Sequence, residues 1–253
     1  MTTRFAIVGV QRTGTTWIRT TLNDHPSILA LGEVFLYRHG RFPFYRRAGS
    51  DVAHSYRQYI QTSWGRRLGH LVRRRAVVHD YLQRLFSQPD LGAVGFKMMH
   101  TQAVAFPAAI DYLLSERIRI IHVVRRNVLK TLISRESARQ RHLYHARSRV
   151  PVKQITLDVG KLRGNLERIC ADNAFWKKTF EGSDYLELAY EDFVQQRNVQ
   201  LNIICDFLNV APAREVESSL VKINPDAISE IVANYSQVVS ALRETPYEWC
   251  LAG

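Results

Sequence analysis

Short apolar runs alternate with segments of helical periodicity along most of this chain. Four runs predict strands that are covered on both faces, at 5–10, 93–96, 118–124 and 185–188. The intervening segments predict helices at 15–24, 70–87, 102–115, 127–146, 158–180, 195–208 and 226–242. Alternating strands and helices predict an α/β fold, P-loop-like and three-layered, with a central parallel sheet and helices on both faces.

The length of 253 residues suits a single domain spanning 1–253. Periodicity is weak at 33–69 and 147–157, and long loops in a domain of this size usually serve a function. We therefore expect 38–90 and 140–160 to contain insertions or lids on the substrate side of a site.

The first predicted strand runs into a glycine-containing loop and then a helix. Gly9 and Gly14 have the spacing of a phosphate-binding P-loop, with Thr15 at the position of the usual Lys. Gly14 lets the backbone approach an anion, and the N–H groups of the helix N-terminus favour negative charge there. Arg12 adds a positive charge to this loop. The hydroxyl groups available as further donors belong to Thr13, Thr15 and Thr16.

The missing Lys changes the chemistry expected of this loop. A phosphoryl-transfer P-loop uses its Lys on the β- and γ-phosphates and a strand-end Asp for the magnesium ion. No Asp ends an apolar strand in this chain. The loop thus predicts a phosphate site without the apparatus for a magnesium nucleoside triphosphate, and we expect no metal.

The loop resembles the 5′-phosphosulfate loop of sulfotransferases that use 3′-phosphoadenylyl sulfate (PAPS) as donor. The matching residues are Arg12-Thr13-Gly14-Thr15-Thr16-Trp17. The continuation through His25-Pro26 to Gly32-Glu33 resembles the bacterial carbohydrate branch, which includes the Nod-factor and trehalose sulfotransferases. The resemblance implies a sulfotransferase that releases 3′-phosphoadenosine 5′-phosphate (PAP), and it implies an aromatic contact of Trp17 with the adenine.

A second motif follows the strand at 118–124. Arg126 and Ser134, eight residues apart, resemble the 3′-phosphate site of the family. An Arg fork and a hydroxyl group suit a phosphate. Arg125 is the alternative, because side chains alternate at a strand end. A weaker match is the run Tyr190-Glu191-Asp192-Phe193, which is similar to the family's Tyr-Glu-Asp turn.

Two residues are candidates for the general base that takes the acceptor proton. Glu33, expected in a loop after the first helix, is the base that the trehalose-type branch implies. His100 lies just past the second predicted strand, where the cytosolic branch has its catalytic His. We place Glu33 first. Lys97 could hold the sulfuryl group or the substrate, and a solvent-exposed strand-end charge is an equal alternative.

Charge extends the picture beyond the loop at 9–16, which is called the donor loop below because the resemblance assigns it to the sulfuryl donor. The chain carries 35 Lys and Arg against 23 Asp and Glu, a net charge of +12, and residues 38–84 account for +9 of it. Aromatic residues accompany 11 Arg in this stretch, which suits sugar stacking and anion contacts. We expect it to form the acceptor side of the cleft. Peripheral membrane association is also possible, because the predicted helix over 70–84 is amphipathic and basic.

Composition limits the environment and the function classes. Three widely spaced cysteines favour a reducing compartment, and the N-terminal apolar run is too short for a signal peptide, so we expect a cytoplasmic protein. The expected acceptor is a hydroxyl group of a glycan, a glycolipid or a small natural product. The alternatives are a P-loop nucleotide kinase and a basic nucleic-acid binder, although we expect no nucleic-acid partner. The sequence does not predict an oligomeric state.

Overall fold

The computed structural model describes residues 2–36, 55–88, 90–141, 154–212 and 227–252. Its centre is a five-stranded sheet in the order β2-β3-β1-β4-β5, and every paired neighbour is parallel. The strands are β1 (Thr3–Gly9), β2 (Ile28–Glu33), β3 (Ala93–Met99), β4 (Arg119–Val124) and β5 (Tyr185–Ala189). The predicted parallel α/β sheet is confirmed.

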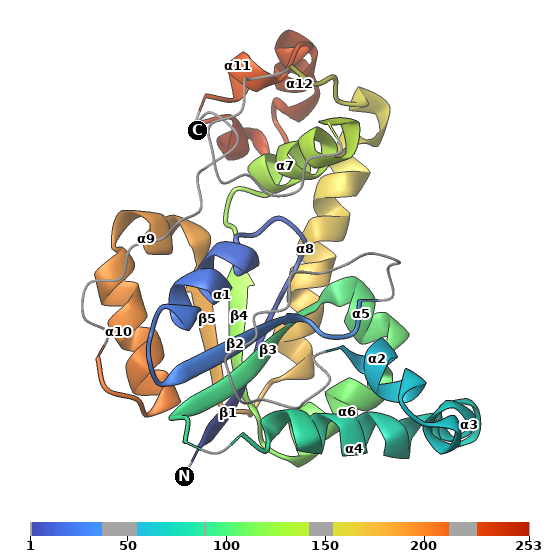
Figure 1. Ribbon diagram of the computed structural model, residues 1–253. Helices are drawn as coiled ribbons and strands as arrows, with labels where there is room; N and C mark the ends of the chain where they lie inside the picture. The colour runs from blue at the N-terminus through green and yellow to red at the C-terminus, as the bar shows by residue number, and fades with distance from the viewer. Residues whose placement is uncertain (1, 37–54, 89, 142–153, 213–226, 253) are drawn as a thin grey trace.

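Helices cover both faces of the sheet (Figure 1). Alternate residues of β1 face opposite layers: Phe5 and Ile7 pack with one apolar cluster, and Ala6 and Val8 pack with the other. The first layer contains α1 (Thr15–Asn23), α9 (Tyr190–Gln195) and α10 (Arg197–Leu208). The second layer contains α2 (Tyr56–Gln61), α4 (Arg74–Phe86), α5 (His100–Ala105), α6 (Pro107–Ser115) and the C-terminal part of α8 (Leu162–Thr179).

A third apolar cluster lies beyond the sheet, at the top of Figure 1. It joins the other end of α8 to α7 (Val128–Arg141) and to the C-terminal segments. Those segments are α11 (Ile228–Ile231), α12 (Tyr235–Leu242) and the 3₁₀ turn η2 (Glu248–Leu251), and a further 3₁₀ turn, η1 (Val159–Lys161), precedes α8.

Several expected elements differ in the structure. The expected helix over 102–115 is two helices, because Pro107 restricts Phe106, whose φ and ψ are −130° and 65°. The expected helix over 70–87 is interrupted at Arg73, which ends α3 (Trp64–Val72) and precedes α4. The expected helix over 226–242 is likewise α11 and α12, with an isolated β-bridge from Ile155 to Val232 between them.

The weakly periodic segment 33–69 contains more regular structure than the sequence predicts. Its described part holds α2 and most of α3, and the chain just before it forms β2. Residues 37–54 and 142–153, which include much of the expected insertions, lie outside the described residues. The interpretation of these insertions as lids therefore stays a prediction.

Candidate functional site

The loop between β1 and α1 passes through a backbone conformation that favours glycine. Gly14 is the N-cap of α1 with φ of 92°, in the left-handed region. A Cβ atom there would lie 2.2 Å from the Tyr190 ring at the start of α9. The Tyr190 ring therefore closes one side of the loop, and the loop has no room for a side chain at position 14.

The first turn of α1 offers backbone donors to an anion. No side chain caps this helix, because its N-cap residue is Gly14, and the nearby Thr13 hydroxyl donates to the Val10 carbonyl at 2.8 Å. The first N–H groups of a helix have no acceptor within it, and the helix dipole is positive there. The turn that contains Thr15 and Thr16 therefore has the backbone donors that an anion needs, and the binding of a phosphate there stays a prediction.

Arg12 and Ser134 lie together, although they are 122 positions apart. The Arg12 Nε atom donates to the Ser134 hydroxyl oxygen at 3.0 Å. Arg12 has φ of 74°, an uncommon value for a residue with a side chain. Ser134 comes from α7, so this contact joins the donor loop to the second predicted phosphate motif.

Arg126 has a different partner from the one that the sequence suggested. Its guanidinium group makes two hydrogen bonds of 2.6 Å to the carboxylate of Asp192 in α9. Backbone N–H groups of Arg126 and Asn127 donate to the Glu191 carboxylate at 3.1 and 3.3 Å. The Tyr-Glu-Asp turn therefore holds the loop that follows β4. Arg125, the alternative residue, places its guanidinium carbon 5.0 Å from the centre of the Tyr190 ring.

Glu33 is the last residue of β2, and the expectation that it lies in a loop was wrong. It pairs in register with Lys97 of β3, next to a β-bulge that separates it from Leu31. The Lys97 Nζ atom lies 2.8 Å from Glu33 Oε1 and donates to the Thr16 hydroxyl at 2.9 Å. The two strand ends thus bring the candidate base and an ammonium group to the start of α1.

Lys97 is a buried cation. Only 7% of its side chain is exposed, which excludes the alternative of a solvent-exposed strand-end charge. Burial lowers the pKa of Lys97 from its ordinary value, and the Glu33 carboxylate opposes that shift. A buried ammonium group needs anionic partners, and the donor loop beside it is a site for one.

Gln102 is a site residue that the sequence analysis missed. Its Nε2 atom donates to Glu33 Oε2 at 2.7 Å, and its Oε1 atom accepts from the Met99 N–H at 3.1 Å. The second contact fixes which end of the buried amide faces Glu33. The available signal was a Gln three residues after a strand end, the position at which a Gln often caps the first turn of a helix.

His100 begins α5 and turns toward α8. Its Nδ1 atom lies 3.3 Å from Asp172 Oδ1, and its ring packs edge-on against Phe175 with centroids 4.8 Å apart. Asp172 also faces Arg135 of α7, whose Nη2 atom is 3.9 Å away. The two candidate bases therefore have different surroundings: Glu33 contacts Lys97, and His100 contacts a carboxylate.

Trp17 lies on the α9 side of α1. Its ring meets Tyr190 and Phe193 edge-on, with centroids 6.0 and 5.2 Å apart. This packing places an aromatic group next to the donor loop. The stacking of Trp17 on an adenine stays a prediction.

His122 is a buried imidazole within β4, on the face that α8 covers. It is 1% exposed, and its Nδ1 atom is 2.5 Å from the Tyr185 hydroxyl oxygen. Burial lowers the pKa of His122 to about 4. The neutral imidazole is therefore part of the core at neutral pH.

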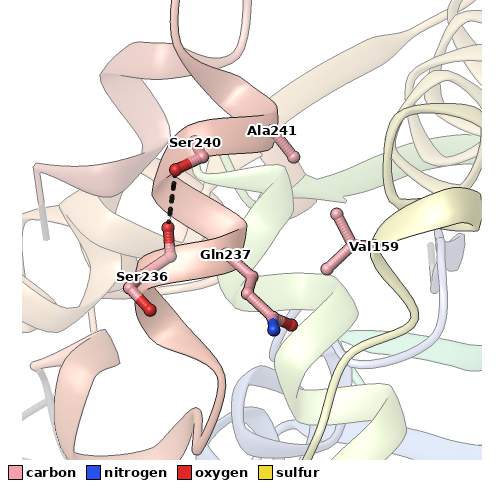
Figure 2. Close-up of a pocket in the computed structure, with 5 residues that line it drawn as sticks. All are labelled: Val159, Ser236, Gln237, Ser240 and Ala241. Carbon is pink, nitrogen blue, oxygen red and sulfur yellow. Dashed lines mark hydrogen bonds between the residues drawn. The ribbon is translucent and has the colours of Figure 1, made fainter.

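A surface hollow near the C-terminus does not share residues with this site. Figure 2 shows it between η1 and α12, lined by Val159, Ser236, Gln237, Ser240 and Ala241. None of these side chains is charged, so the hollow offers no group that could transfer a proton or neutralise an anion.

The described residues lack two other classes of feature. They contain no helix long and apolar enough to cross a bilayer. In the same part of the chain, no group of three or more His, Cys, Asp or Glu side chains could hold a metal ion. The expectation of a metal-free reaction stays a prediction.

Comparisons with known proteins place this chain in a family. Nodulation protein H of Rhizobium tropici is 26% identical over 211 residues, which cover 83% of this chain and 76% of that protein. The crystal structure of a sulfotransferase from Alicyclobacillus acidocaldarius has the same fold, with a TM-score of 0.51 at 15% identity over 89% of this chain and 88% of that one. A mouse sulfotransferase complexed with PAP aligns at 12% identity and a TM-score of 0.47, over 99% of this chain and 87% of that chain. The sulfotransferase family profile matches residues 5–214, and this chain therefore belongs to the sulfotransferase family.

Proposed function

We propose that this sulfotransferase moves a sulfuryl group from PAPS to a hydroxyl group of a carbohydrate or glycolipid, with Glu33 as general base. The contact between Lys97 and Glu33 beside the donor loop is the observation that carries this proposal. Because of this contact, the Glu33 carboxylate and a buried ammonium group lie at the same end of the loop. Sulfuryl transfer needs both, together with an in-line arrangement of acceptor and leaving group.

The residues divide into binding and reacting groups. The first turn of α1 would hold the 5′-phosphate of the donor, and Arg12 and Lys97 would neutralise charge that develops on the sulfuryl group and the leaving phosphate. Glu33 would take the proton from the acceptor hydroxyl as its oxygen bonds to sulfur and the bond from sulfur to the phosphate oxygen breaks. The products are the sulfate ester and PAP.

The fit of the donor to these residues is supported by the shape of the loop. Position 14 has no space for a Cβ atom, and the helix that follows has no side-chain cap. Such a loop leaves its N–H groups to an anion. Arg126 is proposed for the 3′-phosphate, since its fork is 57% exposed and its partner Asp192 could be exchanged for a phosphate. The acceptor class rests on the resemblance to the carbohydrate branch and on the match to Nodulation protein H.

Calorimetry with PAP, compared with ATP, tests the donor site. We expect PAP to bind at one site per chain and ATP to bind at least about tenfold more weakly, because a missing phosphate contact to Arg126 costs about 1.5–3 kcal/mol. We also expect transfer from ³⁵S-labelled PAPS to trehalose, chitooligosaccharides or a glycolipid to continue in EDTA.

Two results would favour the other functions. Tighter binding of ATP, with turnover that requires magnesium, would identify a nucleotide kinase. DNA or RNA binding whose affinity falls over many phosphates as salt rises, without PAP binding, would identify a nucleic-acid binder.

A further inference from the structure

The helix α3 has its apolar side on the outside. Trp64, Leu68, Leu71 and Val72 recur at helical spacing, so their side chains share one stripe of α3. They are exposed to 76%, 49%, 80% and 74%, respectively. A surface helix of a soluble protein normally turns such a stripe toward the core. Here the stripe faces solvent, and no residue of α3 is buried.

The opposite side of α3 explains this orientation. Gly69 lies close to Val77 of α4, since a Cβ atom on it would be 3.1 Å from a Val77 methyl group. His70 Nδ1 is 2.8 Å from the Tyr56 hydroxyl oxygen, and the Arg66 guanidinium carbon lies 4.2 Å from the centre of the Tyr59 ring. The glycine and polar residues of α3 thus pack against α2 and α4. This packing fixes the apolar stripe outward, at the edge of the molecule (Figure 1).

The surroundings of the stripe are basic. Residues 55–79 contain six Arg and no Asp or Glu. Arg67 and Arg73 are exposed, and both belong to the immediate neighbourhood of the stripe in the sequence. Arg74 and Arg75 turn instead toward α5 and α6, where they contact the Ala105 carbonyl and the Asp111 carboxylate.

We propose that α3 docks this protein on the surface of a membrane that contains anionic lipid. Trp64, Leu68, Leu71 and Val72 would enter the boundary between headgroups and acyl chains, where Trp is favoured, and the arginines would face the anionic headgroups. The charge argues against a second copy of this chain as the occupant. A two-fold interface would place each basic surface against the same surface of the other protomer. This proposal does not depend on the proposed sulfuryl transfer.

Co-sedimentation with vesicles tests the proposal. Wild-type protein in about 0.1 M salt should bind vesicles of 70% phosphatidylcholine and 30% phosphatidylglycerol. The variant Trp64→Ser/Leu71→Ser should lower the partition coefficient at least about tenfold, since it removes two large apolar side chains from the stripe. The matched control Val199→Ser/Ile203→Ser removes two exposed apolar side chains from α10 and should change binding less than about twofold.

Two further variants separate the apolar and the electrostatic contributions. Arg67→Gln/Arg73→Gln should weaken binding to the phosphatidylglycerol vesicles and leave binding to pure phosphatidylcholine unchanged. The emission of Trp64 is the difference between the fluorescence spectra of wild type and Trp64→Phe. Its maximum should shift to shorter wavelength when the anionic vesicles are added. All variants should keep the wild-type unfolding temperature and PAP affinity, because the changed residues are exposed and lie outside the donor loop.

Three results would overturn the proposal. The wild type could fail to bind the anionic vesicles, or the α10 control could lose as much binding as the α3 variant. Light scattering could also show a dimer that Trp64→Ser/Leu71→Ser splits, with no lipid binding by the monomer. In that case the stripe would be an interface between two copies of this chain.

Discussion

The Lys97 ammonium group bridges Glu33 and Thr16, at 2.8 and 2.9 Å. One contact is to the candidate base, and the other is to the helix turn that would hold the donor phosphate. Because Lys97 is buried, it cannot exchange these partners for water. The state of the donor loop and the environment of Glu33 are therefore linked through a single side chain.

Replacing Glu33 by Gln should remove the proton acceptor and keep the shape of the site. We expect kcat to fall by about two to four orders of magnitude, the range for loss of a general base. The affinity for PAP, measured by calorimetry, should stay the same or rise, because Lys97 then has no carboxylate partner and can pair with an anion in the donor loop. His100→Ala is the comparison. If Glu33→Gln kept nearly full turnover and His100→Ala lost it, the order of the two bases would be the reverse.

Gln102 should act through Glu33. Gln102→Leu keeps the volume but removes the N–H donor that holds Glu33 Oε2, so kcat should fall about tenfold for a lost hydrogen bond of about 1.4 kcal/mol. In the Glu33→Gln background the same change should have almost no further effect on kcat, because residues that act as one unit are not additive. A tenfold loss in both backgrounds would instead indicate a structural effect of the helix cap.

The ion pair between Arg126 and Asp192 should compete with donor binding. The Arg126 and Asp192 side chains are 57% and 37% exposed, and such surface pairs contribute about 1 kcal/mol or less. Arg126→Ala should raise the Kd for PAP at least tenfold, by loss of a charged hydrogen bond of about 1.5–3 kcal/mol. Asp192→Asn should leave that Kd unchanged or lower it. Weaker binding in both variants would show that the pair mainly supports the loop.

Gly14 should tolerate no side chain. Gly14→Ala places a Cβ against the Tyr190 ring in a left-handed backbone, so calorimetry should show no PAP binding at concentrations that saturate the wild type. Gly164→Ala is the control, because its Cβ would have no neighbour within 4 Å in α8. That variant should gain about 0.5–1 kcal/mol of stability and keep full PAP affinity.

His122 should make the protein less stable in acid. Its pKa is about 4 in the folded protein, and an unfolded chain has an ordinary value near 6.5. Between these two pKa values the unfolded state binds more protons than the folded state. The free energy of unfolding therefore rises as pH increases across this window and falls as pH decreases across it. The full effect is about 3 kcal/mol. Urea unfolding of wild type and His122→Asn at pH 7 and pH 4.5 should show a smaller pH dependence in the variant.

The part of the site that follows local rules was predictable from the sequence. The donor loop joins a strand to the helix that follows it directly in the sequence, so a contiguous motif specifies its geometry. The strand at 28–33 was not predicted, because its apolar run is only four residues long and ends at Gly32, as a loop segment could. With it, the position of Glu33 at a strand end was missed as well.

Contacts between distant elements were not predictable in the same way. Gln102 meets Glu33 through the packing of α5 beside β2, and His100 meets Asp172 through the packing of α8. No spacing along the chain encodes either contact. The inverted orientation of α3 also depends on tertiary packing, although its amphipathic pattern is visible in the sequence.

The packing of the Tyr190 ring on Gly14 has a consequence for protein engineering and for evolution. The two residues stand 176 positions apart, but Gly14 cannot gain a side chain while the Tyr190 ring is in place. A donor loop that is transplanted into another scaffold would lose the ring that packs on it here, which comes from the helix after the strand two places away in the sheet. In related chains, the first motif and the Tyr-Glu-Asp turn should vary as one inherited unit.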